Sequence, residues 1–442
     1  MKSPRTTSRA SQKHETPAST EVLVEIEKPV YGGNFLARNE GKAIFVPLVL
    51  PGETVRSRIV QNKSGYATAE PLAIQDPSEL RVAPKCPHFG SCGGCNYQHT
   101  EYANQLAFKQ AILRETLERA GISVLPEIGI LSSNPWEYRN RIRIAFDADG
   151  NPGYRGRRSH QVVPIRACPI AAPILMAAAQ AAGEILARMP ANLRPHELLL
   201  FCDPAESALL GTFFGAGPAH LRLESIAAAL LDAIPQLKGA QLATGGRPGH
   251  PPKTLARWGE PALEYPAAGI TYRVDHGAFF QVNRWLIDAF VSNVISEAQG
   301  ALAWDLYAGV GLFARQLAAR FERVIAVESA PASCAALAVN LERTSGTAVS
   351  ASTLEFLRSE AQSPRPDLIV VDPPRTGLES GISALLVEVR APQFVYVSCD
   401  PATLARDLAI LITGGYRVAE AHLVDLFPQT YHLETVLHLA LP

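Results

Sequence analysis

The last third of the chain repeats one pattern, a short run of apolar residues followed by a helical stretch, and this pattern constrains the fold more than any other feature. The apolar runs lie in AWDLYAG, RVIAVES, LIVVDPP and FVYVSCD. Strands this apolar are buried on both faces, which predicts a parallel, doubly wound α/β sheet covered by helices. The final HLVDLFP and HLETVLHLAL predict a closing pair of strands. Ligands of such sheets bind at the carboxyl ends of the strands.

Two smaller folded regions precede this sheet. Residues 21–76 hold short β-branched runs broken by Gly-Gly, Pro-Gly and Lys-Ser-Gly turns, which predicts a five-stranded barrel, either of the oligonucleotide-binding (OB) type or one that only packs. Residues from about 138 to 277 alternate strands with an Ala-rich helix near 171–188, which predicts an inserted α+β domain. Between them, YANQLAFKQAILRETLERAGI predicts a helix that ends at Gly121.

Composition and charge favour a cytoplasmic protein. The first 20 residues are polar, which predicts a disordered tail and no secretory signal. The absence of any run of about 18 apolar residues argues against a transmembrane helix. Seven cysteines, an odd number, fit reduced thiols better than disulfides. With 41 basic and 42 acidic residues, a surface that binds nucleic acid has to be local. We expect a cytoplasmic monomer that does not contact membranes.

The loop after the first apolar strand carries the features of a nucleoside site. DLYAGVGLFARQLA places Asp305, Gly309 and Gly311 at the carboxyl end of that strand, where glycine lets a ligand approach the backbone. Glu328 ends the second strand, 17 residues after Gly311, and a carboxylate there can accept hydrogen bonds from both ribose hydroxyls. A tight turn that uses glycine only for its geometry is the alternative.

Two further strand ends place reactive groups at the same edge. In VVDPPRTGLE, Asp372 precedes two prolines that hold the loop in an extended conformation. Such a rigid loop can present an acidic group to a planar base, or it can be only a stiff turn at the end of the strand. In VYVSCDPATLARDL, Cys399 ends a strand, and Asp400 is expected to cap the helix that begins at Pro401. A thiolate is favoured beside a helix N-terminus, so we predict Cys399 as a nucleophile.

The remaining single candidates are interpreted by their surroundings. Cys202 and Cys334 have no chemical groups near them in the sequence and are predicted to be structural. Glu434 stands in an otherwise apolar terminal strand, so its carboxylate is either exposed or functional, and we predict a general base. His432 and His438 are expected on one alternating face and are interpreted as structural.

Four cysteines predict a metal site. CPHFGSCGGC supplies Cys86, Cys92 and Cys95, and RACPI supplies Cys168. Four thiolates suit zinc or an iron–sulfur cluster. The spacing matches neither the paired spacings of a zinc ribbon nor those of radical enzymes, and it favours iron–sulfur. We expect the metal to hold the segments of the inserted domain together, at a position away from the edge of the sheet where ligands bind.

Arginines are concentrated in one segment. Residues 138–166 hold seven arginines and two aspartates. Arg139, Arg141 and Arg143 alternate along a predicted strand, so their side chains share one face. This face could follow phosphates, or it could be an ordinary solvated strand.

These motifs together resemble the bacterial uracil-5 RNA methyltransferases, and most closely the 23S ribosomal RNA branch with a TRAM domain and a four-iron, four-sulfur cluster. The resemblance covers nearly all of residues 21–442. The motifs that carry it are PGE near Pro51, CPHFGSCGGCNYQH, FFQVN, DLYAGVGLF, DPPRTG, SCDPATLARDL and HLET.

The resemblance implies a division of the chain and a set of site residues. It implies a TRAM barrel at 21–76, a central iron–sulfur domain at 77–99 and 138–277, and a class I S-adenosylmethionine methyltransferase domain at 100–137 and 278–442, on which the helix from about 102 to 120 packs. Cys399 would be the nucleophile and Glu434 the base. The cluster ligands would be Cys86, Cys92, Cys95 and Cys168. The residues of the cofactor or uracil pocket would be Gln281, Tyr307, Gly309, Gly311, Leu312, Glu328 and Asp372.

Two positions depart from the family pattern. Leu312 stands where relatives often have Asn, and Ser352 or Thr353 stands where an acidic residue commonly meets the adenine. Contacts to the cofactor are therefore expected to differ, while no reacting group is lost.

The expected reaction is methylation of carbon 5 of a uridine that is flipped out of folded 23S ribosomal RNA. Carbon 5 is a poor nucleophile until a thiolate adds to carbon 6, which is the role implied for Cys399. A base must then remove the carbon-5 proton, which is the role implied for Glu434. The alternatives are a transfer RNA substrate, a non-catalytic RNA-binding protein, and a methyltransferase that acts on an amine.

Overall fold

The computed structural model describes residues 20–215, 222–245, 252–360 and 364–441. Apart from Thr20, the tail predicted for residues 1–20 lies outside these ranges. The chain forms two compact units, one up to Arg81 and one from Val82 onward.

The first unit is a closed barrel with strand order β1-β2-β3-β5-β4, which confirms the predicted OB-like barrel. The strands are β1 Glu21–Val30, β2 Asn34–Asn39, β3 Lys42–Pro47, β4 Thr54–Asn62 and β5 Tyr66–Asp76. Glu53 is fully buried at the start of β4, where its carboxylate accepts hydrogen bonds from the Arg81 guanidinium at 2.6 and 2.7 Å. This pair satisfies a charge that would be costly to bury alone.

The second unit contains a seven-stranded sheet, the central sheet, with order β13-β12-β11-β10-β7-β8-β9. Its strands are β7 Arg141–Phe146, β8 Pro152–Arg155, β9 Val162–Pro164, β10 Glu197–Cys202, β11 Leu209–Phe214, β12 Leu237–Ala243 and β13 Thr254–Gly259. Helices α2 Pro173–Ala187 and α3 Leu223–Ala233 pack on it and on each other, and a short 3-10 helix, η1, spans Ala191–Leu193. Alanines let α2 lie close to the strands, and its Ala178, Ala179 and Ala182 are fully buried.

The same unit contains an eight-stranded sheet, the C-terminal sheet, with order β18-β17-β16-β19-β20-β22-β21-β6. Its strands are β6 Ile128–Leu131, β16 Gly300–Leu306, β17 Phe321–Glu328, β18 Gly346–Ser350, β19 Leu368–Val371, β20 Gln393–Ser398, β21 Arg417–Val424 and β22 Thr435–Ala440. The five strands β16 to β20 are parallel, and β22 runs antiparallel to both β20 and β21. The predicted doubly wound α/β sheet with a closing strand pair is therefore confirmed.

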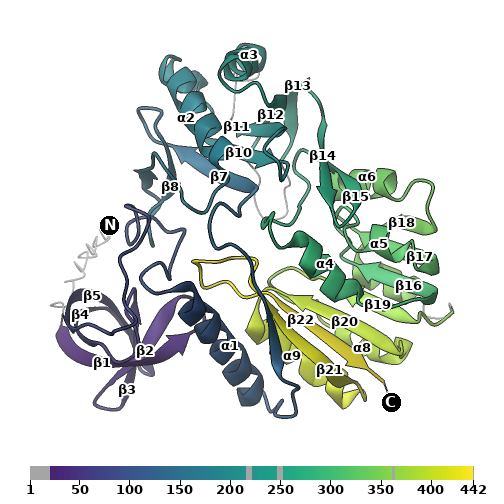
Figure 1. Cartoon of the computed structure of the whole chain (residues 1–442), viewed down its shortest axis with the longest axis horizontal. Helices are drawn as coiled ribbons and strands as arrows, with labels where there is room; N and C mark the ends of the chain where they lie inside the picture. Colours follow the sequence, from purple (N-terminus) through teal and green to yellow (C-terminus); the bar gives the residue numbers. More distant parts are fainter. Residues whose placement is uncertain (1–19, 216–221, 246–251, 361–363, 442) are drawn as a thin grey trace, which may run out of the picture. The chain divides into compact units, whose positions relative to one another are not determined.

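The helices of the C-terminal sheet are α1 Tyr102–Arg119, α4 Ile287–Ile295, α5 Ala314–Leu317, α6 Pro331–Asn340, α7 Thr353–Ser359, α8 Ile382–Val389 and α9 Pro401–Thr413. Helix α1 and strand β6 precede the central sheet in sequence, yet α1 packs against α9 and β6 pairs with β21 (Figure 1). The resemblance implied this packing of α1. A buried ion pair fixes it, because Lys109 Nζ lies 2.6 Å from Asp425 Oδ1 and both side chains are fully buried.

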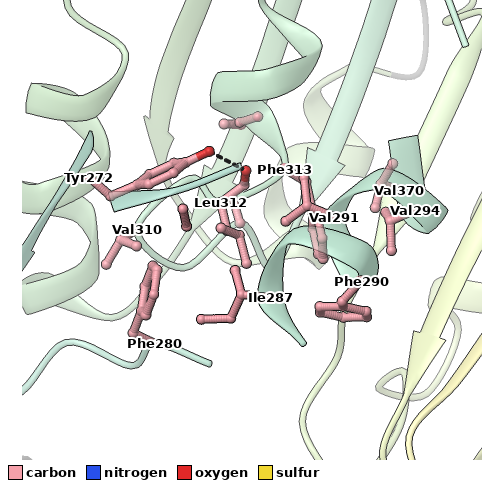
Figure 2. Close-up of a cluster of buried hydrophobic side chains, with 14 of the residues drawn as sticks. Tyr272, Phe280, Ile287, Phe290, Val291, Val294, Val310, Leu312, Phe313 and Val370 are labelled. Carbon is pink, nitrogen blue, oxygen red and sulfur yellow. Dashed lines mark hydrogen bonds between the residues drawn. The ribbon is translucent and has the colours of Figure 1, made fainter. Parts of the chain in front are cut away.

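A hairpin of β14 Ala262–Ala267 and β15 Ile270–Asp275 lies between the two sheets in sequence and corrects the expected domain boundary. Its buried Tyr272 belongs to one hydrophobic cluster with residues of α4 and of the loop after β16 (Figure 2). The hairpin thus packs with the C-terminal sheet, although the sequence analysis assigned residues up to 277 to the central domain, and its Tyr265 also stacks on Phe201 of β10 in the central sheet. The alternation of apolar and polar residues is similar before and after residue 260, so the sequence contains no indication of where the central domain ends.

Candidate active site

The carboxyl ends of four parallel strands meet at one edge of the C-terminal sheet, here called the carboxyl edge. Leu306 at the end of β16 pairs with Val327 of β17 and with Val371 of β19, and Val371 pairs with Tyr396 of β20. Four of the predicted site residues lie at these strand ends: Glu328 is the last residue of β17, and Tyr307, Asp372 and Cys399 directly follow β16, β19 and β20. Strand register therefore brings them to the same edge.

The glycine loop after β16 uses its two predicted glycines differently. Both have positive φ, 58° at Gly309 and 90° at Gly311. A Cβ at Gly311 would lie 2.7 Å from Leu337 Cδ1, so a larger residue at this position would force the Leu337 side chain of α6 to shift. A Cβ at Gly309 would meet nothing within 4 Å. Only Gly309 therefore has the open space that a ligand near the backbone needs.

Glu328 is held against this loop by backbone amides. Its Oε2 accepts a hydrogen bond from Gly309 N at 2.9 Å, and its Oε1 accepts from the amides of Ser329 and Ala330 at 2.7 and 2.6 Å. Each carboxylate oxygen has further lone pairs, so ribose hydroxyls could still donate to it. Close by, the Tyr307 hydroxyl donates to Glu379 Oε2 at 3.0 Å.

Leu312 does not face this site, which corrects its assignment to the cofactor pocket. Its side chain is 6% exposed and lies in the hydrophobic cluster with Ile287 and Phe280 (Figure 2). Its backbone carbonyl accepts a hydrogen bond from the Tyr272 hydroxyl at 3.0 Å. Leucine at this position therefore serves the core and leaves no polar group for a cofactor.

Ser352 is also occupied within the protein. Its hydroxyl accepts a hydrogen bond from Glu355 N, and Glu355 Oε2 accepts from Ser352 N, which forms a capping box at the start of α7. Thr353 is buried and hydrogen-bonds the Tyr307 hydroxyl. Neither residue offers a carboxylate to a ligand at this position.

Cys399 and Glu434 face each other across adjacent strands. Ser398 at the end of β20 pairs with Thr435 at the start of β22, so the next residue of each strand occupies opposing positions. Glu434 is 4% exposed, while Cys399 is partly exposed. Burial raises the pKa of the Cys399 thiol to about 12, and the charges of Glu434 and Asp372 contribute to this rise. The structure therefore brings together Cys399 and Glu434, the residues predicted as nucleophile and base, although they lie far apart in the chain.

Asp372 and Glu434 form a pair of neighbouring carboxyl groups, of which Glu434 is buried and Asp372 is partly exposed. Burial raises the pKa of Asp372 to about 7. Burial and then the charge of Asp372 raise the pKa of Glu434 well above its usual value. Two neighbouring carboxyl groups that repel each other's charge do not ionise together readily, so the pair retains a proton to higher pH than an ordinary carboxyl group does.

Arg375 is a residue of this site that sequence reasoning missed. Its positive charge lowers the pKa of both Cys399 and Glu434, against the stronger effect of burial. Its Nη2 lies 3.3 Å from the ring of His432, whose pKa is lowered to about 3 by burial and then by Arg375. The available signal was its position directly after the two prolines of VVDPPR. His432 lies before β22 and not within it.

Gln281 lies in the segment that joins the hairpin to α4. It is buried, and its carbonyl accepts a hydrogen bond from Asn140 Nδ2 at 2.9 Å. Two residues later, Asn283 Nδ2 donates to the carbonyls of Asp425 and Leu426 at 3.4 and 3.3 Å. The Gln281 segment is thus bonded to the loop between β21 and β22, at whose end Glu434 lies.

The four predicted metal ligands line one cavity of about 760 Å³, here called the cysteine cavity. Burial raises the pKa of the Cys92 thiol, and the charges of Cys168 and Cys86 raise it further. Burial likewise raises the pKa of Cys95 to about 12, with contributions from Cys168 and Cys92. All four cysteines line this one cavity, and neighbouring thiols contribute to the raised pKa of Cys92 and of Cys95.

The sulfur atoms in the cysteine cavity are spread apart. In the part of the chain that the structure describes, one group of three His, Cys, Asp or Glu residues has its ligand atoms within 4.8 Å of one another, and it contains no cysteine. No three of the four sulfur atoms are therefore that close. A ZnS₄ tetrahedron with bonds of about 2.3 Å has edges of about 3.8 Å. The spacing fits a larger group better than a single zinc ion.

Backbone bonds tie the cysteine cavity to the loop that precedes Glu434. The amides of Asn96 and Tyr97, which follow Cys95, donate to the Gln429 carbonyl at 2.9 and 3.1 Å. The sequence analysis expected the metal site to lie away from the edge of the sheet, and that position stays a prediction. The bonds connect the segment after Cys95 to the β21–β22 loop, at whose end Glu434 lies.

The arginine face is partly neutralised. Arg139, Arg141 and Arg143 all line the cysteine cavity, as do the alternating residues Ile142 and Ile144, so this lining does not test the predicted common face. Arg143 and Arg155 both pair with Glu197, at 2.5 and 3.0 Å, and Arg141 lies over the Phe201 ring at 4.3 Å. The Arg139 charge lowers the pKa of Cys92, Cys95 and Cys168, so this guanidinium lies beside the thiols.

Two other predictions concern single residues and the membrane. The Asp400 carboxylate accepts hydrogen bonds from Ala402 N and Thr403 N at 3.0 Å, which confirms the predicted cap of α9. Cys202 is buried, and Cys334 Sγ donates to the Glu328 carbonyl at 3.1 Å. Within the described ranges, every helix is too short or too polar to cross a membrane.

Comparison with family models finds two matches in the chain. Residues 261–441 match the tRNA (Uracil-5-)-methyltransferase family, and residues 19–72 match the TRAM domain. The first match begins at the β14–β15 hairpin, in agreement with the packing of that hairpin on the C-terminal sheet.

Three relatives match nearly the whole chain. The 23S rRNA (uracil(1939)-C(5))-methyltransferase RlmD of Pectobacterium atrosepticum is 33% identical over 91% of this chain and 90% of its own length. The protein of the same name from Halomonas elongata is 32% identical over 94% and 89%. A protein of Streptomyces avermitilis described as an uncharacterized RNA methyltransferase is 33% identical over 94% and 97%.

One solved structure has a similar fold along the chain. The tRNA (uracil-54, C5)-methyltransferase of Pyrococcus abyssi, in complex with S-adenosyl-L-homocysteine, superposes with a TM-score of 0.75 at 23% identity and covers 95% of this chain and 100% of that one. The C-terminal sheet accordingly has the class I fold of S-adenosylmethionine-dependent methyltransferases.

Proposed function

The chain belongs to the S-adenosylmethionine-dependent RNA (uracil-5-)-methyltransferase family, and on that premise we propose that it methylates carbon 5 of a uridine in 23S ribosomal RNA through a covalent adduct on Cys399. Two relatives named as 23S ribosomal RNA enzymes, each aligned over about nine tenths of its length, support this substrate. The observation that carries the mechanism is the opposition of Cys399 and Glu434 across β20 and β22.

The proposed reaction uses three side chains of the carboxyl edge. The Cys399 thiol gives its proton to Asp372, and its sulfur forms a bond to carbon 6 of the uracil. The electron pair of the carbon 5–carbon 6 double bond moves toward the oxygen on carbon 4, which makes carbon 5 nucleophilic. After carbon 5 has gained the methyl group, Glu434 removes its proton, and the electron pair left behind re-forms the double bond and expels the sulfur.

The environment of each group fits its role. A raised pKa makes the Glu434 carboxylate a stronger base than an exposed one. The raised pKa of Cys399 keeps its thiol protonated before substrate binds, and Arg375 is the neighbouring positive charge that opposes this effect. Burial of Glu434 also excludes water from the proton that it must take.

The cofactor would lie along the loop after β16. S-adenosylmethionine, when bound, supplies an electrophilic methyl group and a positive charge on sulfur. Gly309 leaves space for a ligand against the backbone, and the Glu328 carboxylate is held where ribose hydroxyls could donate to it. Tyr307 would line the same site, and Gln281 would line the uracil side.

We further propose that Cys86, Cys92, Cys95 and Cys168 hold an iron–sulfur cluster. The four thiols converge on one cavity, and their sulfur atoms are too widely spaced for a single zinc ion. The Arg139 guanidinium beside them would offset negative charge on the ligated cluster. The cluster would fix the segment that bonds to Gln429, and thus the loop that leads to Glu434.

Trapping with 5-fluorouridine RNA tests the covalent mechanism. Fluorine replaces the carbon-5 proton, so a methylated adduct cannot be resolved and remains attached to the sulfur. We expect the wild-type protein with cofactor to form a complex that survives denaturation, as does the control Cys334→Ala. Cys399→Ala should form none. Failure of the wild type to trap any RNA, or trapping by Cys399→Ala, would contradict the mechanism.

The substrate is tested separately. Ribosomal and transfer RNA from a strain that lacks the gene should be digested and analysed by mass spectrometry, with the complemented strain as the control. We expect one or more uridines of 23S ribosomal RNA to lose a methyl group. If methyl groups are lost from transfer RNA alone, the proposed substrate is wrong, but the proposed reaction at Cys399 is unaffected.

A further inference from the structure

The edge of the C-terminal sheet carries a second group of potential metal ligands, separate from the cysteines and from Cys399. Glu420, His422 and His438 place one ligand atom each within 4.8 Å of the others. Glu420 pairs directly with His438 across β21 and β22, and His422 pairs with Val436 two residues along. Alternation therefore puts all three side chains on the same face of the strand pair. The sequence analysis had interpreted His438 as structural.

Both imidazoles have a nitrogen atom with no internal partner. His422 Nδ1 and His438 Nε2 are buried and lack a hydrogen bond. A buried polar atom without a partner is costly, and it commonly marks an ion or water that completes the site. The two rings lie edge to face, with centroids 6.2 Å apart and an interplanar angle of 87°, so they do not stack on each other.

The other side of the His438 ring is oriented by the backbone. The Asn293 carbonyl of α4 hydrogen-bonds this ring, and since Nε2 has no partner, the bonded atom is Nδ1. This bond selects the tautomer with its proton on Nδ1 and leaves the Nε2 lone pair free. Imidazoles that bind metal ions are oriented in the same way, by a carbonyl or carboxylate that accepts from the other nitrogen.

Strand β6 leaves room for the second ring. Gly129 pairs with His422, and a Cβ at position 129 would lie 2.7 Å from His422 Cδ2. Any larger residue would displace the imidazole from the group. Glu420 is exposed, so an ion could reach the group from solvent on the side of the carboxylate.

We propose that Glu420, His422 and His438 form a zinc site on the outer part of the C-terminal sheet. Two imidazole nitrogens and one carboxylate oxygen are a ligand set that suits Zn²⁺, with water in a fourth position, whereas Mg²⁺ and Ca²⁺ prefer oxygen ligands only. The ion bridges β21 and β22, four residues beyond Glu434. Its role is to hold these two strands together, and it takes no part in the methyl transfer.

The test measures bound zinc in the full-length protein. Wild type, His422→Gln and His438→Gln are equilibrated with Zn²⁺, freed of unbound metal and analysed for zinc content. His196→Gln, which changes an exposed histidine of the central sheet, is the matched control. Any metal bound elsewhere in the protein is the same in all four samples, so it does not affect the difference in zinc content between them. We expect each of the first two variants to hold one equivalent less than wild type and His196→Gln.

A spectroscopic measurement identifies the ligands of the missing equivalent. With Co²⁺ in place of Zn²⁺, the difference between wild type and His422→Gln should show visible d–d bands without thiolate charge-transfer absorption. Equal metal content in wild type and both histidine variants, or a difference spectrum with thiolate bands, would overturn the proposal.

Folding of the variants is checked by thermal melting in the presence of chelator. If the histidine variants have a lower melting temperature than wild type even with chelator present, the Glu420→Gln variant, which changes an exposed residue, is used to test the site. Wild-type melting should rise with added Zn²⁺, and that rise should shrink in Glu420→Gln. An unchanged rise in Glu420→Gln would count against the site.

Discussion

Two regions of this protein are built around cysteine, and they obtain their geometry in different ways. At the carboxyl edge, strand pairing sets Cys399 opposite Glu434, and the neighbours of the thiol are carboxyl groups and Arg375. In the cysteine cavity, the ligands stand on loops, and the neighbours of each thiol are other thiols and Arg139. The same residue type thus suits covalent chemistry in one region and metal binding in the other because of its neighbours.

The comparison predicts that a substitution at the carboxyl edge lowers the rate of the reaction but leaves the metal content of the cysteine cavity unchanged. Glu434→Gln keeps the shape of the side chain but removes the base. We expect turnover to fall by roughly two to four orders of magnitude, and an adduct with ordinary uridine RNA to accumulate because its carbon-5 proton remains. Denaturing gels measure the adduct. A variant that turns over normally would remove Glu434 from the mechanism.

A substitution in the cysteine cavity should instead remove the bound metal, and the rate of the reaction should fall as a consequence of that loss. Cys168→Ser removes one proposed ligand, so we expect loss of visible iron–sulfur absorbance in protein purified without oxygen and a fall in the melting temperature. Activity should fall as well, because the segment after Cys95 is bonded to Gln429. Cys202→Ser, outside the cavity, is the control for absorbance. If the visible absorbance of Cys168→Ser equals that of wild type, Cys168 is not a cluster ligand, and the proposed metal-binding role of the cysteine cavity is contradicted.

The carboxyl pair predicts opposite effects of pH on activity and on stability. The pKa of Asp372 is raised to about 7, so the reaction rate should rise with pH through this value as the pair loses its proton. The folded protein binds this proton more tightly than the unfolded chain does, so its contribution to stability is complete below pH about 4 and is lost as pH rises through about 7. Asp372→Asn should flatten this part of both profiles, as measured by initial rates and denaturant unfolding. A stability profile identical to wild type would contradict the raised pKa.

The smallest expected effects separate the two glycines of the carboxyl edge. Gly311→Ala should destabilise the fold by about 1–3 kcal/mol, because its Cβ would meet Leu337 and its φ is positive. Gly309→Ala adds only the strain of positive φ and should act mainly by weakening cofactor binding. Chemical unfolding and equilibrium dialysis with the cofactor measure the two effects. Equal destabilisation by both would show that Gly309 also serves packing.

The sequence predicted the parts of the site that depend on strand register. Apolar strands with a reactive residue directly after each one give Glu328, Asp372 and Cys399 a common edge, since parallel strands end together. Arg375 was missed because its role depends on where its side chain reaches, and no local pattern encodes this. Leu312 was misassigned by resemblance, although its apolar side chain was itself a signal of the core.

The parts that could not be predicted depend on contacts between distant loops. The bonds from Asn96 and Tyr97 to Gln429 join segments more than 300 residues apart, and neither segment has a periodic pattern. The group of Glu420, His422 and His438 requires the register of β21 against β22, including an irregularity between Val418 and Glu420 that shifts the pairing. Alternation read from the sequence alone cannot place such a shift.

The buried pair of Lys109 and Asp425 has a consequence for biosynthesis. These residues lie 316 positions apart in the chain. At about 5–20 residues per second, a ribosome needs roughly 15 to 60 s to travel between them. During that interval α1 has left the ribosome with an unneutralised lysine on its packing face, and β6 has no neighbouring strand. The nascent chain must therefore keep α1 and β6 without their final partners while the central sheet is synthesised, and these two elements can pack only after Asp425 and β21 have left the ribosome.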